Sequence, residues 1–120
     1  MTLALLDAQP KLTGLLDGGL DAVDAALQAA FAAAEPDNAL IMALNSLRSR
    51  YVFDRMRVTR AQIVADDAAP ETAQILTDLS SACGKLEEIQ TGNAATTDWV
   101  NKASSAVDTA FGIFSKLAKL

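Results

Sequence analysis

The sequence lacks histidine and has little of several other residue types. Its 120 residues include one cysteine, three prolines and only 5% aromatic side chains. Without histidine, the chain has neither the commonest general base nor the usual nitrogen ligand for zinc, haem or di-iron. The single cysteine, Cys83, cannot by itself form an intrachain disulfide or a multi-cysteine metal site. We therefore expect a protein that is not an enzyme and that needs no cofactor and no metal.

The sequence shows no pattern typical of a targeting segment or a membrane span. The apolar run from Ala22 to Ala34 contains Asp24 and Gln28, and it is shorter than the roughly 20 apolar residues that cross a bilayer. A secretory signal requires a basic residue before its apolar run, and no basic residue precedes the leucines near the N-terminus. Together with the lone cysteine, these features predict a cytoplasmic protein without a membrane span.

The hydrophobic residues, 51% of the chain, recur at helical spacing in four segments, and alternating strand patterns are almost missing. We expect residues 1–120 to form a single all-α domain, an antiparallel four-helix bundle, because the segments are of comparable length and the loops are short. A three-helix core with an N-terminal helical arm is the alternative. The expected helices are residues 10–34, 38–65, 70–91 and 94–119.

Breakers and capping residues set these boundaries. Pro10 suits the first turn of a helix, while Gly18-Gly19 weakens the same helix enough that a break there is an open alternative. Glu35 to Asn38 combines a proline with two good N-cap residues. Gly92 suits the left-handed position after a helix, and Asn93 suits the cap of the next one.

Two apolar stripes show the helical period clearly and predict core positions. The stripe of the first helix comprises Leu12, Leu16, Leu20, Val23, Leu27, Phe31 and Ala34. The stripe of the fourth helix comprises Val100, Ala103, Val107, Ala110, Phe114 and Leu117. Both sets recur at steps of three and four residues, as one buried face of a helix requires.

The net charge of −5 conceals a strongly uneven distribution. Residues 1–37 sum to −5, residues 38–65 to +4, residues 66–98 to −6 and residues 99–120 to +2. Every arginine of the chain lies in the second predicted helix, and all other basic residues are lysines. The cation that binds carboxylates in a planar, bidentate manner is thus confined to one element.

This second helix carries two apolar faces, whereas a helix with one buried side needs only one. The first face comprises Leu40, Leu44, Leu47, Tyr51 and Val58. The second face comprises Ile41, Met42, Val52, Phe53, Met56, Ile63 and Val64. At 100° per residue, Arg48 and Arg55 form one row between the faces, Arg50 and Arg57 form the other, and Arg60 falls within the second face.

Two interpretations of this helix compete. In one, the helix is the most buried of the bundle, and its arginines lie along apolar surface and pair with the flanking acidic segments. In the other, the second face contacts another protein, either a second copy or a different partner, because methionine, aromatic residues and arginine are enriched in interface cores. The partner-binding residues would then be Arg48, Arg50, Arg55, Arg57, Arg60, Met42, Val52, Phe53 and Met56.

We therefore expect a protein-interaction or assembly module that self-associates or forms a small subunit of a larger complex. An acidic chaperone or inhibitor that masks a partner is the alternative within the binding class. A bundle that encloses a small apolar ligand would use Trp99, Phe111 and Phe114. The acidic balance and the scattering of the arginines around the helix disfavour nucleic-acid binding.

One acidic row has the spacing to line a helical face, as a cation site would require. Asp17, Asp21 and Asp24 recur at helical spacing on one face, but no loop with alternating ligands accompanies them. We expect this row to face solvent or the arginines.

Overall fold

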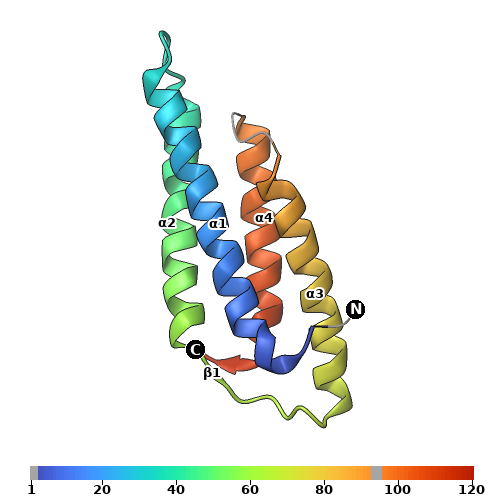
Figure 1. The fold of residues 1–120 in the computed structure, drawn as a ribbon. Coiled ribbons are helices and arrows are strands. Elements are labelled where there is room, and N and C mark those ends of the chain that lie inside the picture. The colour runs from blue at the N-terminus through green and yellow to red at the C-terminus, as the bar shows by residue number, and fades with distance from the viewer. Residues whose placement is uncertain (1–2, 93–95) are drawn as a thin grey trace.

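The computed structural model describes residues 3–92 and 96–120, and in these ranges the chain is an all-α bundle of four helices, as predicted (Figure 1). The helices are α1 (Leu5–Ala32), α2 (Asn38–Arg60), α3 (Pro70–Gln90) and α4 (Thr97–Phe114). Two short strands, β1 (Gln62–Ile63) and β2 (Ala118–Lys119), pair antiparallel at one end of the bundle.

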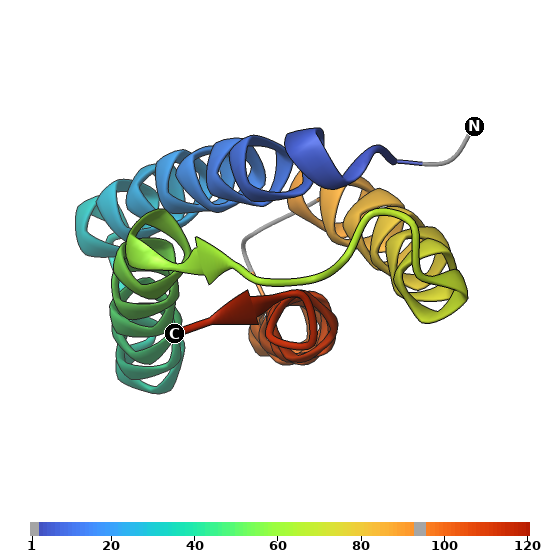
Figure 2. The ribbon, with the colours of Figure 1, turned by 90° about the horizontal axis from the view of Figure 1, so that it is seen from below.

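The helices pack as two antiparallel hairpins laid against each other. Helix α1 pairs with α2 and α3 pairs with α4, while α1 also packs on α3 and α2 on α4. The chain between α2 and α3 crosses the end of the bundle, so the helices that meet between the hairpins run in the same direction (Figure 2). Because α1 packs against two helices, it is part of the bundle, and the alternative with a separate N-terminal arm is wrong.

Helix α1 differs from its prediction at its start and near its middle. It begins at Leu5, so Pro10 lies inside the helix instead of in its first turn. It also runs without a break through Gly18 and Gly19. Gly19 is buried beneath the ring of Tyr51, whose hydroxyl accepts a hydrogen bond of 2.8 Å from Gln90 Nε2. Tertiary packing from α2 and α3 therefore outweighs the low helix propensity of the two glycines.

Helices α2 and α4 end five residues before their predicted ends, because the chain after each helix forms a strand instead. Gln9 of α1 supplies the stop for α2: its Nε2 donates to the carbonyl oxygens of Val58 at 2.7 Å and of Ala61 at 3.0 Å. The Val58 carbonyl also accepts a hydrogen bond of 3.2 Å from Ala61 N, so Gln9 adds a second donor at the end of the helix. The end of α2 is thus fixed by a residue distant in sequence.

The remaining junctions agree in part with the sequence. The Asp37 side chain accepts a hydrogen bond of 3.1 Å from Leu40 N and caps α2, as predicted. Gly92 is not left-handed, since no glycine in the described ranges has a positive φ. The predicted cap Asn93 and the predicted start of the last helix at residue 94 lie outside the described residues. Thr96 caps helix α4 as described, because its side-chain Oγ1 accepts a hydrogen bond of 3.1 Å from Trp99 N.

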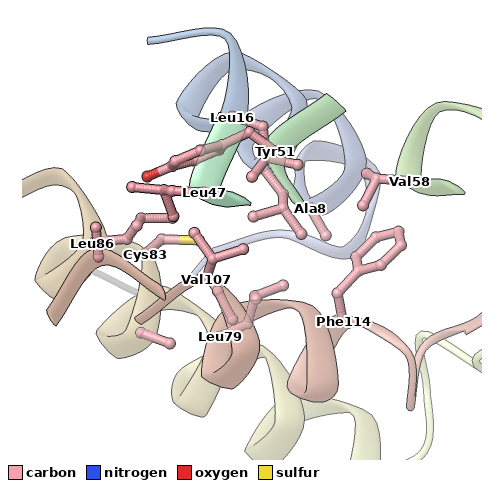
Figure 3. Packing of buried hydrophobic residues seen from close by; sticks show 14 of the residues in the cluster. Ala8, Leu16, Leu47, Tyr51, Val58, Leu79, Cys83, Leu86, Val107 and Phe114 are labelled. Carbon is pink, nitrogen blue, oxygen red and sulfur yellow. The ribbon is translucent and has the colours of Figure 1, made fainter. Parts of the chain in front are cut away.

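The core lies between the two hairpins, where Tyr51 and Phe114 are the largest fully buried side chains (Figure 3). Every residue of the predicted stripe on the fourth helix is buried. On α1 the prediction is wrong at Phe31 and Ala34, which are both exposed. The reason is visible in Figure 1, where the α1–α2 hairpin extends beyond the ends of α3 and α4, so these residues have no helix opposite them.

Candidate protein-interaction surface on α2

Helix α2 turns its first apolar face into the bundle. Leu44, Leu47, Tyr51 and Val58 are buried there, and Leu40 is half-buried at the end of the row. This placement agrees with the predicted first face. It leaves the opposite side of α2 without a covering helix, since α1 and α4 contact α2 from its two flanks.

One row of arginines fastens α2 to α1. Arg48 Nε donates to Asp24 Oδ1 at 2.7 Å. Seven residues further along α2, Arg55 donates to Asp17. The predicted acidic row on α1 therefore faces arginines at two of its three positions. All four side chains are about half exposed, so each pair contributes at most about 1 kcal/mol to stability. The pairs join α2 to α1 at two points along the helix.

The second row of arginines fastens α2 to α4. Arg50 bonds to Asp108 and also lies 3.4 Å from Ser104 Oγ. Arg57 carries its guanidinium 4.5 Å from the ring centroid of Phe111 and 5.3 Å from that of Phe53. A guanidinium between two aromatic rings is held by the electron-rich ring faces. Four of the five arginines thus have partners within the chain.

Asp54 was not singled out from the sequence, although it is buried at the seam between α2 and α4. Burial raises the pKa of its carboxyl group, and Asp108 adds to this, while Arg50 and Arg57 lower that pKa. A signal was present in the sequence, because Asp54 falls at the edge of the first apolar face of the helix.

The side of α2 that faces away from the bundle carries four large exposed apolar side chains. The exposed fractions are 71% for Met42, 45% for Val52, 54% for Phe53 and 39% for Met56. Short polar residues and one arginine complete the same side of the helix, and all of them are exposed. We call this surface the outer face of α2; it comprises Met42, Asn45, Ser46, Ser49, Val52, Phe53, Met56 and Arg60.

The structure separates the nine predicted site residues into two groups. Met42, Val52, Phe53, Met56 and Arg60 share the outer face, and Arg60 makes no ion pair within residues 3–92 and 96–120. The other four arginines lie on the two flanks and hold α1 and α4. The predicted second face also extends too far, because α2 ends at Arg60 and places Ile63 in β1.

The aromatic residues proposed for a small apolar ligand do not enclose a common cavity. Trp99 and Phe114 are buried in the core, and Phe111 lies against Arg57. A groove of about 500 Å³ does lie between α3 and α4, but none of these three aromatics lines it. Its lining includes Ala82, Lys85, Ile89, Asn101, Lys102, Ser105, Ala106 and Thr109.

Cys83 is buried in the core, and Figure 3 shows it between Leu86 and Val107. Burial raises the pKa of its thiol, Glu87 adds to this and Lys11 lowers that pKa. In the described part of the chain, no three histidine, cysteine or acidic side chains cluster to hold a metal ion. None of the helices described is both long and apolar enough to cross a bilayer.

These features define the class of the protein as an all-α helical bundle with an apolar surface on one of its helices. Comparison of the chain with protein-family models, with curated proteins and with solved structures found no match.

Proposed function

We propose that this chain is a non-enzymatic protein-interaction module that binds another protein through the outer face of α2, and that it acts in the cytoplasm. The observation that carries the proposal is the exposure of Met42, Val52, Phe53 and Met56 along one side of a single helix. Single exposed apolar residues are ordinary, whereas a group on one side of a helix, here Val52, Phe53 and Met56 as neighbours at helical spacing with Met42 further along, is typical of an interaction surface.

The arginine rows support the proposal by holding α2 in one orientation. If α2 rotated to bury its outer face, Arg48 and Arg55 would leave the acidic residues of α1. The same rotation would expose Tyr51, which is fully buried. The outer face is therefore pre-oriented for a partner, so binding needs little rearrangement of the backbone.

The composition of the outer face favours an apolar contact over an electrostatic one. Arg60 is the only charged residue of the outer face, and the outer face contains no acidic side chain. An acidic inhibitor that masks a basic partner would be expected to present carboxylates there. The lone buried cysteine, which needs no oxidising environment, supports the cytoplasmic location.

The test is a double substitution, Phe53→Ser with Met56→Ser, compared with the matched control Phe31→Ser. Phe31 is also exposed but lies on α1, one residue before the end of that helix, and is not part of the outer face. Proteins that the tagged wild type retains from its native cell, untagged copies of the chain included, are compared among the three forms. We expect the double variant to fold and to lose at least about tenfold in retained partner, as loss of interface anchors does, while the control binds normally.

Two results would overturn the proposal. The first is a folded double variant that retains every partner as the wild type does. The second is unfolding of the double variant, measured by circular dichroism, because this would show that Phe53 and Met56 belong to the core.

A further inference from the structure

The outer face of α2 is self-complementary about Ser49. Met42 and Met56 lie seven residues on either side of Ser49. Asn45 precedes Ser49 by four residues and Phe53 follows it by four, so a shorter side chain lies before Ser49 and a longer one lies after it. In an antiparallel pair of such helices crossing at Ser49, each residue meets the residue equally far from Ser49 in the partner.

This geometry pairs Met42 of each copy with Met56 of the other, and it places the remaining two large side chains opposite smaller ones. Phe53 of each copy meets Asn45 of the other, and Val52, three residues after Ser49, meets Ser46, three residues before it. Ser49 meets itself at the crossing point, where small residues allow two helices to approach closely. Alternation of large and small residues across a helix pair is how well-packed interfaces fill their volume.

The charges at the two ends of the outer face select the same orientation. Arg60 follows Ser49 by eleven residues, while Asp37 precedes it by twelve. Arg60 is exposed without an ion pair in the described ranges, and Asp37 uses only Oδ1 to cap α2. An antiparallel pair therefore brings Arg60 near Asp37 of the second copy, and it also opposes the two helix dipoles.

A parallel pair has none of these advantages. In a parallel pair each residue meets its own copy at the same height along the helix axis. The level of Phe53 is then crowded by two large rings, and the level of Ser49 is left with a void. A parallel pair also places Arg60 beside Arg60 of the other copy. Both bundles lie behind their own α2, so neither orientation is blocked by α3.

We propose that the outer face of α2 binds the outer face of α2 in a second copy of this chain, with the two helices antiparallel and a two-fold axis at Ser49. This inference rests on the proposed function, since it names the partner of the same surface. The occupant follows from the complementarity of size and charge within one helix.

Cysteine crosslinking tests the arrangement. In a Cys83→Ala background, Ser49→Cys and the matched control Asn45→Cys place single thiols on the outer face, where both native residues are exposed. In the proposed pair the two copies of residue 49 meet, whereas the two copies of residue 45 are eight levels apart, or about 12 Å along the axis at 1.5 Å per residue. That separation is beyond the reach of a disulfide.

With diamide as the oxidant, we expect Ser49→Cys to shift from monomer to disulfide-linked dimer, and Asn45→Cys to stay monomeric. Light scattering of the wild-type chain is expected to give the mass of a dimer. Equal crosslinking at both positions, no crosslinking at residue 49, or a strict monomer at high concentration would each overturn the inference. If partner retention still depends on Phe53 and Met56 in that case, the proposed function stands with a different partner.

Discussion

We predict that Gly19→Ala destabilises the bundle, although alanine is the better helix former. A Cβ atom added at Gly19 would lie 2.5 Å from Tyr51 Cζ and 2.5 Å from Gln90 Nε2. Non-bonded contacts of a Cβ atom are essentially never this short, so the Tyr51 ring, the Gln90 side chain or the helix backbone must shift. The ring of Tyr51 is fully buried, which leaves it no open space to enter.

The magnitude follows from two opposing effects. Replacing glycine with alanine inside a helix contributes about 1 kcal/mol of stability. Forcing an additional methyl group into a packed core costs about 1–3 kcal/mol, and disturbing the hydrogen bond between Gln90 and Tyr51 costs about 1 kcal/mol more. We therefore expect the free energy of unfolding to fall by about 1–3 kcal/mol in total.

Urea unfolding followed by circular dichroism measures this change, and Gly14→Ala in the same helix is the matched control. No atom that would meet a Cβ at Gly14 lies within 4 Å, so this variant is expected to gain about 0.5–1 kcal/mol. Replacing the ring with a smaller side chain, in Tyr51→Leu, should remove most of the destabilisation caused by Gly19→Ala, as measured in a double-mutant cycle. Equal stabilisation by Gly19→Ala and Gly14→Ala would refute the reasoning.

Two further predictions concern buried groups that titrate. Because burial raises the pKa of Asp54, the folded state binds its proton more tightly than the unfolded chain does, and stability falls as pH rises from 3.8 through that raised pKa. Asp54→Asn should therefore increase the free energy of unfolding at neutral pH but not at acid pH below this window; an equal change in urea melts at both would contradict this. Cys83 should react with a thiol reagent only after unfolding, and rapid labelling of the native chain would contradict its burial.

The helices and the core were predictable wherever a helix carries one apolar stripe that faces the interior of the bundle. Helix α4 shows this, because its stripe from Val100 to Phe114 is wholly buried, and Leu117 beyond its end is buried as well. The ends of α2 and α4 were not predictable, since they depend on Gln9 and on the pairing of β1 with β2. These contacts join residues far apart in sequence, and helical periodicity carries no information about them.

The uneven placement of arginine predicted that α2 is special, but its meaning differs between the flanks and the outer face. On the flanks, Arg48 and Arg50 bind carboxylates of α1 and α4, as the first of the two competing interpretations requires. On the outer face, Phe53 and Met56 are exposed, which the second interpretation requires. Each interpretation therefore fits one part of the helix: the arginines of both flanks pair within the bundle, while the apolar side chains of the outer face stay exposed, so α2 is not buried on all sides.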